Sequence, residues 1–160
     1  MNEEWLIDGY NLLHFIAARK KTGSAIPSTK TALCSALAGF AACRRHRVCI
    51  VFDGSGSPDE LKVHETRFFS AVYSLKVTAD THIEKYIFDN KASLRLTVVT
   101  DDRTVSNLVR GGGGRVLKNS EFLEMLMETG HEKDKALHDE KVRSHGFNRP
   151  FDEKLKTKGL

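Results

Sequence analysis

The sequence has few cysteines, and their positions exclude two kinds of small stabilised domain. Among 160 residues only Cys34, Cys43 and Cys49 are present, an odd number without a Cys-x-x-Cys pair. Such a set supports neither a disulfide framework nor a thiolate zinc site. Free cysteines are typical of a reducing compartment, so we predict a cytoplasmic location.

Long apolar runs are also absent. No stretch approaches the roughly 20 consecutive apolar residues that a membrane-spanning helix needs. The N-terminal Met-Asn-Glu-Glu carries acidic residues where a signal peptide carries basic ones. The sequence therefore predicts no membrane partner.

Several enzyme motifs are missing. The turn after the first apolar run lacks Gly-x-Gly-x-x-Gly, which argues against a nicotinamide or flavin cofactor. A phosphatase of the haloacid dehalogenase type would need an aspartate where Tyr10 stands, and no Gly-x-Ser-x-Gly elbow occurs at a strand-to-helix turn. The four glycines at 111–114 precede a strand and lack the Gly-Lys-Ser/Thr of a phosphate loop. We therefore predict no nucleotide cofactor.

Composition indicates one globular domain followed by a tail. With 40% hydrophobic and 29% charged residues, the chain can bury one core but is too short for two ordinary domains. We predict a domain over residues 1–129 and a charged tail over 130–160, partly helical or disordered. The net charge of +4 weakly favours a polyanionic partner.

Short apolar runs alternate with helical periodicity along the first part of the chain. This alternation predicts a Rossmann-like α/β fold, a three-layer α/β/α arrangement with a mainly parallel sheet. Ser28 and Ser120 are the expected N-caps of two helices, and residues 59–67 show no clear periodicity. The predicted strands are 5–7, 48–52, 68–75, 94–99 and 115–117.

Acidic residues follow three of these strands and begin one helix. Two apolar runs are followed directly by an acid, Asp8 and Asp53. A third run is followed, after one threonine, by the pair Asp101 and Asp102, and Asp80 begins a helix. Parallel strands end at a common edge of the sheet, so we expect these carboxylates to converge. Clustered carboxylates repel unless a cation neutralises them, and hard oxygen ligands suit Mg²⁺ or Mn²⁺. The pattern predicts a metal-dependent phosphodiesterase.

Two features have structural alternatives that the sequence leaves open. Asp8 can serve as a helix N-cap after a strand. The basic cluster at residues 44–47 can stabilise a helix C-terminus or contact phosphates. The residues that we predict to bind RNA are Arg44, Arg45, Arg47, Arg103 and Arg110.

Four motifs in a fixed order resemble a known family. They are Ile-Asp-Gly-Tyr-Asn at 7–11, Val-Phe-Asp at 51–53, Thr-Ala-Asp-Thr-His-Ile-Glu-Lys at 78–85 and Val-Val-Thr-Asp-Asp at 98–102. Together they resemble the YacP-like branch of the NYN domains, within the PIN-like nuclease superfamily, over about residues 5–128. The resemblance implies a PIN-like fold and RNA cleavage with Mg²⁺ or Mn²⁺. For the bacterial branch it also implies a ribosome-associated endonuclease acting on mRNA.

The resemblance also implies roles for individual residues. The family commonly has serine where Asp101 stands, which leaves open whether Asp101 or Asp102 is the metal ligand. The implied catalytic set is Asp8, Asn11, Asp80 and Asp102, with Asp8, Asp80 and Asp102 as metal-binding acids, Asn11 and Glu84 in support, and Asp53 nearby.

Three functional hypotheses follow. The first is a cytoplasmic, metal-dependent endoribonuclease. The second is a non-catalytic module that binds RNA or the ribosome and retains the acidic pocket. The third is a phosphatase that acts on small molecules.

Overall fold

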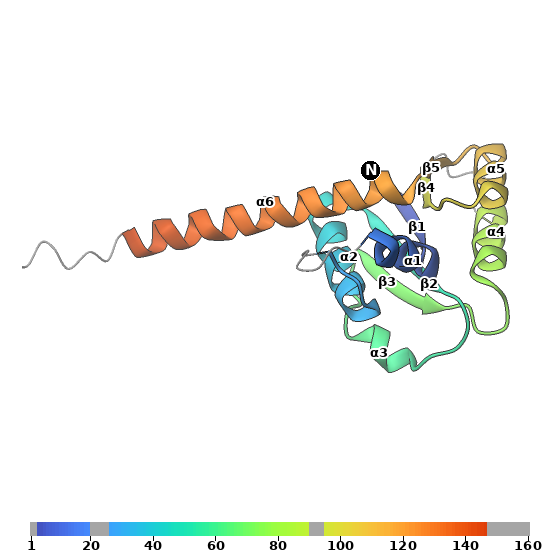
Figure 1. Cartoon of the computed structure of the whole chain (residues 1–160), viewed down its shortest axis with the longest axis horizontal. Coiled ribbons are helices and arrows are strands. Elements are labelled where there is room, and N and C mark those ends of the chain that lie inside the picture. Colours follow the sequence, from blue (N-terminus) through green and yellow to red (C-terminus); the bar gives the residue numbers. More distant parts are fainter. Residues whose placement is uncertain (1–2, 20–25, 90–94, 147–160) are drawn as a thin grey trace, which may run out of the picture.

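The computed structural model describes residues 3–19, 26–89 and 95–146 (Figure 1). Strands and helices alternate along the chain as the sequence predicts. The strands are β1 (Glu4–Asp8), β2 (Arg47–Phe52), β3 (Phe69–Tyr73), β4 (Leu96–Val99) and β5 (Arg115–Leu117). The helices are α1 (Gly9–Arg19), α2 (Lys30–Arg44), α3 (Pro58–Lys62), α4 (Ala79–Asp89), α5 (Arg103–Gly111) and α6 (Asn119–Gly146).

The five strands form one sheet in the order β3-β2-β1-β4-β5. Every neighbouring pair is parallel, and the central strand β1 pairs with β2 on one side and β4 on the other. The chain therefore builds outward from β1 in two directions. In open α/β sheets, the carboxyl ends of the strands at such a switch point are where ligands bind.

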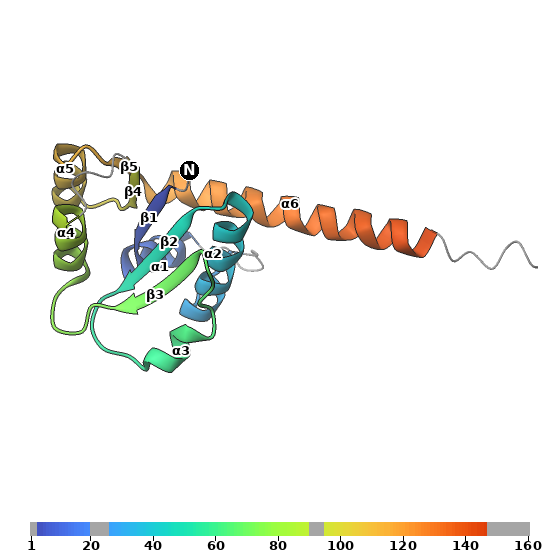
Figure 2. The same ribbon diagram turned by 180° about the vertical axis from the view of Figure 1, so that it is seen from behind.

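Helices cover both faces of the sheet, because successive side chains of each strand point to opposite faces. Trp5 and Ile7 of β1 pack with α1, α2 and α6, whereas Leu6 packs with α4 and α5. Figures 1 and 2 show α4 and α5 lying side by side, apart from α1 and α2. The predicted three-layer α/β/α fold is confirmed.

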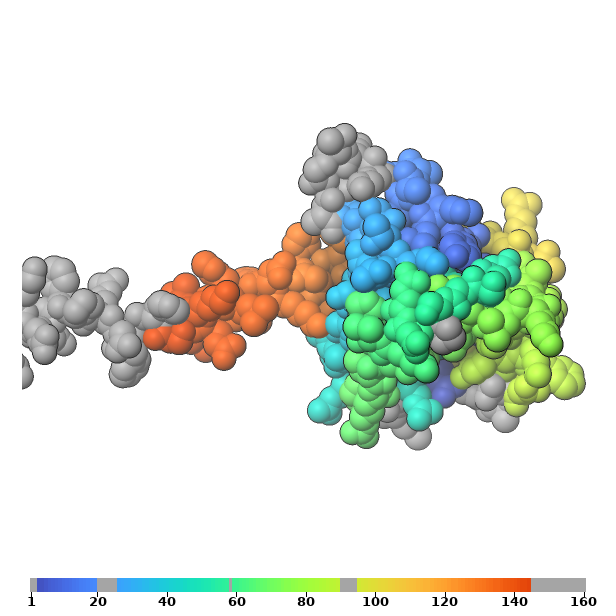
Figure 3. Space-filling view, turned by 90° about the horizontal axis from the view of Figure 1, so that it is seen from below, coloured from blue at the N-terminus to red at the C-terminus, as the bar shows by residue number. Residues whose placement is uncertain are grey.

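The last helix is longer than the sequence indicates. Phe122 and Leu126 of α6 are buried in the core, and the Lys133 ammonium donates to the Gly39 carbonyl oxygen at 2.8 Å. From residue 134 to residue 144 every side chain is exposed, and this end of the helix extends away from the body (Figure 3). The helix passes residue 130 without a break, and the division of the chain there stays a prediction. Within the described ranges, no helix has the length and apolar character to cross a bilayer.

Both predicted N-caps are wrong by one or two positions. Thr29, not Ser28, caps α2, since its hydroxyl oxygen accepts the Ala32 N–H at 3.2 Å. The helix expected to be capped by Ser120 begins earlier, at Asn119. There the Glu121 carboxylate accepts the backbone N–H of residue 118 at 3.0 Å, which is one half of a capping box.

Two further boundaries differ from the sequence prediction. A short helix, α3, occupies residues 58–62, where proline at the first helical position presets the backbone. The third strand ends at Tyr73, two residues early, because Leu75 adopts a left-handed φ of 54°. The beginning of the predicted strand 94–99 includes residue 94, which lies outside the described residues, and β4 begins at Leu96.

The two halves of α6 should respond differently to truncation of an apolar side chain. Phe122→Ala should lower the free energy of unfolding by about 3–5 kcal/mol, since Phe122 is fully buried. Leu137→Ala should change it by less than about 0.5 kcal/mol, because that side chain is 55% exposed. Urea denaturation of both variants measures the difference. Equal losses would show that the far half of the helix is packed.

Candidate active site

Asp8 ends the central strand and is only 8% exposed. Its Oδ1 accepts the backbone N–H of Asn11 at 3.2 Å, so the carboxylate also caps α1. This is the helix-capping role that the sequence left open for Asp8. A Cβ atom on Gly9 would lie 2.5 Å from Cδ1 of Phe52. The glycine is needed for this close approach, which seats the start of α1 directly over β2.

The electrostatic surroundings of Asp8 are acidic. Burial raises the pKa of the Asp8 carboxyl above its ordinary value of 3.8, and the N–H of Asn11 lowers this pKa in part. The negative charges of three other carboxylates raise the pKa further, those of Asp80, Asp53 and Asp102. The ionised form of Asp8 is therefore disfavoured by both burial and like charge.

Asp80 has similar surroundings in the first turn of α4. Burial raises the pKa of its carboxyl, and the charges of Asp102, Glu84 and Asp53 raise it further. Among the described residues, no cation contributes to the pKa shift of either carboxyl. The mutually repelling carboxylates, hereafter the acid cluster, are Asp8, Asp53, Asp80, Glu84 and Asp102.

Asp101 and Asp102 have different partners. The Oδ1 of Asp102 accepts the Val105 N–H at 2.9 Å and caps α5. The Oδ1 of Asp101 accepts the backbone N–H of Asn119 at 3.2 Å, and its charge shifts the pKa of neither Asp8 nor Asp80. The geometry therefore favours Asp102 over Asp101 as a member of the acid cluster.

Asn11 connects the ends of three strands. Its side-chain oxygen accepts the Asn119 amide at 2.6 Å and the Asp101 N–H at 3.4 Å. Asn119 is 1% exposed, and its own Oδ1 is buried without a partner among the described residues. The sequence analysis missed Asn119. Asn119 lies two residues after the fifth strand, at the kind of position where other strands carry acids, and this position could have marked it as a site residue.

The five predicted RNA-binding arginines are not brought together. Arg44 ends α2 and Arg47 begins β2, so both lie at the amino edge of the sheet, with Arg45 between them. Arg103 and Arg110 lie on α5, where they line a cavity of about 490 Å³ that also includes Asp101. Only this second group adjoins the residues that follow β4.

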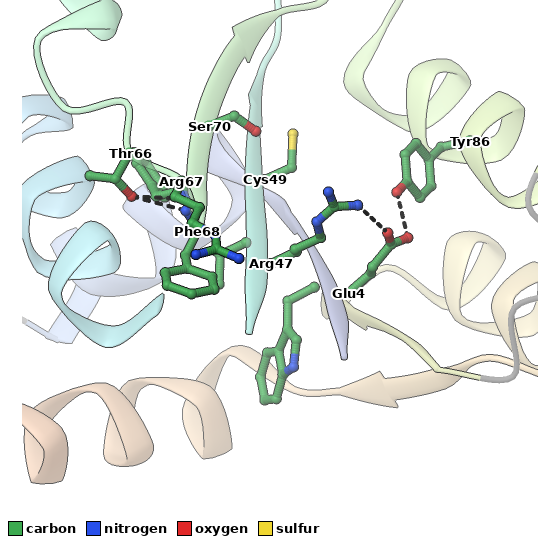
Figure 4. Close-up of a pocket in the computed structure, with 11 residues that line it drawn as sticks. Glu4, Arg47, Cys49, Thr66, Arg67, Phe68, Ser70 and Tyr86 are labelled. Carbon is green, nitrogen blue, oxygen red and sulfur yellow. Dashed lines mark hydrogen bonds and ion pairs between the residues drawn. The ribbon is translucent and has the colours of Figure 1, made fainter. Parts of the chain in front are cut away.

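The amino edge has a cavity of its own, of about 310 Å³ (Figure 4). Arg47 forms an ion pair with Glu4 there at 3.4 Å, and the Tyr86 hydroxyl donates to the same carboxylate at 2.8 Å. Nearby, the Arg44 guanidinium donates to the Thr129 hydroxyl at 3.4 Å. These arginines already have partners within the fold.

The chemistry of the acid cluster fits a hard divalent cation. Its donors are all carboxylate oxygens, and their mutual repulsion is the condition that a bound Mg²⁺ or Mn²⁺ would relieve. Across residues 3–19, 26–89 and 95–146, no three acidic, histidine or cysteine side chains lie close enough to surround an ion. The donor set fits the metal in type, while the side chains stand apart.

The structure combines an all-parallel α/β/α fold with acids at the carboxyl edge of its central strands, as the resemblance to the NYN domains implies. The family model of the YacP-like NYN domain matches residues 5–159, and the chain therefore belongs to this family. It is a nuclease family, which supports RNA cleavage at the level of the family.

Two solved structures share the fold. One is Rae1 (YacP) from Bacillus subtilis, 19% identical, with a TM-score of 0.71 over 96% of this chain and 90% of the other. The second is a tryptophan-to-leucine variant of Rae1 (YacP) from Bacillus subtilis, 22% identical, with a TM-score of 0.64 over 97% and 90%. A search of curated proteins found no match.

Asp8→Asn should not destabilise the protein in a chelator. The raised pKa means that ionised Asp8 destabilises the fold above that pKa, and that this effect is lost as the pH falls below 3.8. The asparagine variant should therefore be at least as stable as the wild type at pH 7, with the difference shrinking toward pH 4. Urea denaturation in EDTA at both pH values measures this. A large loss of stability at pH 7 would make Asp8 chiefly a structural cap.

Proposed function

We propose that this protein is a divalent-metal-dependent endoribonuclease that cleaves mRNA in association with the ribosome in the cytoplasm. The observation that carries the proposal is the buried carboxylate of Asp8 at the switch point of the sheet. Within the described part of the chain, the charges that shift its pKa come from other carboxylates alone. A fold retains such repulsion where a function needs it. Membership of a nuclease family supports the reaction, and the resemblance to the bacterial branch supports the ribosome as a partner.

In this proposal Asp8, Asp80 and Asp102 hold Mg²⁺ or Mn²⁺, with Asp53, Asp101 and Glu84 beside them. A bound divalent ion activates water and stabilises the charge that develops on phosphate. Asn11 is a positioning residue, because its side chain joins the Asp101 backbone to Asn119. The N–H groups of Asn11 and Val105 hold the carboxylates of Asp8 and Asp102 at fixed places on the edge.

One observation favours a second candidate function. The described carboxylates stand too far apart to surround an ion. A non-catalytic module that binds RNA or the ribosome would have the same fold and would tolerate this spacing. The two candidates differ in whether RNA is cut.

Three substitutions should abolish cleavage without abolishing binding. Asp8→Asn, Asp80→Asn and Asp102→Asn should each reduce the cleavage rate by more than about 100-fold, since loss of mere outer partners of a metal costs about 10- to 100-fold. RNA affinity should stay similar or rise, because each change removes negative charge facing a polyanion. Asparagine is also a good N-cap, so Asp102→Asn should keep α5 intact. Cleavage of labelled RNA with Mn²⁺, both naked and in a translation reaction, measures the effect.

The matched control is Asp139→Asn, an exposed aspartate on α6 far along the chain from the acid cluster. This variant should cut at the wild-type rate. Mn²⁺ should raise the melting temperature of the wild type and of this control, and Asp8→Asn should lose most of that shift. RNA or ribosome binding without metal-dependent cleavage in either setting would reject the enzyme in favour of the binding module.

A further inference from the structure

One face of α5 carries basic and polar side chains beside a cavity. Arg103, Ser106, Asn107 and Arg110 are spaced i, i+3, i+4 and i+7, which places them on a single helix face. They line the cavity of about 490 Å³, and Lys118, which follows β5, adds a third cation to it. We call this cavity the α5 pocket.

The three cations of the α5 pocket have no acidic partners within the described part of the chain. Within those residues, the guanidinium groups of Arg103 and Arg110 form no ion pair and no side-chain hydrogen bond. The same holds for the Lys118 ammonium. Arg44 and Arg47, at the opposite edge, are both engaged. Cations that line one cavity and form no ion pairs repel one another, and a bound polyanion would relieve that repulsion.

One carboxylate also lines the pocket. The Oδ1 of Asp101 is occupied by the Asn119 N–H, at 3.2 Å. Three cations against this single acid leave the α5 pocket with a positive balance. Its ligand is therefore anionic.

Two residues that line the α5 pocket are hydrogen-bonded to the backbone of Asp102, a member of the acid cluster. The Thr100 hydroxyl accepts the Asp102 N–H at 3.1 Å, and the Ser106 hydroxyl donates to the Asp102 carbonyl oxygen at 2.6 Å. Thr100 and Ser106 line the pocket, while the Asp102 carboxylate belongs to the acid cluster. A ligand in the pocket would lie directly beside the proposed reaction centre.

We propose that the α5 pocket binds the backbone phosphates of single-stranded RNA beside the bond that the acid cluster cleaves. The placement of the scissile bond rests on the proposed function. Arg103 and Arg110 are seven residues apart, which is about 10 Å along the helix. Each strand of duplex DNA advances about 3.4 Å per phosphate, and by that measure this face of the helix spans two or three successive phosphates.

Salt-dependent binding tests this assignment. Arg103→Ala, Arg110→Ala and Lys118→Ala are each made in an Asp8→Asn background, and a fluorescent single-stranded RNA is titrated in EDTA at several salt concentrations. Each variant should lower the slope of log affinity against log salt by about 0.7, the value for one lost contact to a single strand. Affinity should fall several-fold at moderate salt. Melting temperatures should be unchanged, because all three positions lie outside the buried core.

Arg95→Ala is the matched control, since it removes an exposed arginine that precedes β4 at the opposite edge and should leave the slope unchanged. Three outcomes would each overturn the proposed role of the α5 pocket. They are unchanged slopes for the pocket variants, an equal effect of Arg95→Ala, and no salt-dependent RNA binding at all. Binding in EDTA needs no cleavage, so the two proposals fail separately. If the protein never cuts RNA but the pocket variants still lower the salt-dependence slope, the α5 pocket is supported and the proposed nuclease activity is rejected.

Discussion

The buried carboxylate of Asp8 is the constraint on which the arrangement of this protein depends. It ends the central strand, where neighbours on both sides keep it from solvent, and its exposed fraction is 8%. The hydrogen bond that it accepts from the Asn11 N–H compensates its burial only in part, since the pKa of the carboxyl stays raised. The packed strands around it, with Ile7 and Val51 fully buried, supply the stability that offsets this charge.

The topology explains why acids distant in sequence lie at one edge of the sheet and influence one another's pKa. Each strand runs in the same direction, so whatever residue follows its apolar run lies at the same edge. Asp53 after β2 and Asp102 after β4 reach Asp8 from opposite sides of the central strand. This convergence was predictable, because it needs only the strand ends and the parallel rule.

The same rule, applied further, would have separated the predicted arginines. A helix that follows one parallel strand returns the chain to the amino edge before the next, so Arg44 and Arg47 had to lie opposite the acids.

Other features of the structure could not be predicted from the sequence. Asn11 and Asn119 are 108 positions apart, and their hydrogen bond depends on how β5 docks beside β4. The length of α6 was missed because a charged helix without an apolar stripe has little periodic signal.

Opposite charges lie close together in this fold without neutralising each other. Asp102 and Arg103 are adjacent in sequence but have different surroundings. The Asp102 carboxylate caps α5, and its charge raises the pKa of Asp80, whereas Arg103 lines the α5 pocket. An ion pair between the two groups would relieve both repulsions and would stabilise the free protein. The Asp102 carboxylate instead accepts the Val105 N–H in the first turn of α5, and it forms no ion pair with Arg103. The fold thus keeps a group of carboxylates and a group of cations side by side, and the proposed metal ion and phosphate chain would each need one of these two groups.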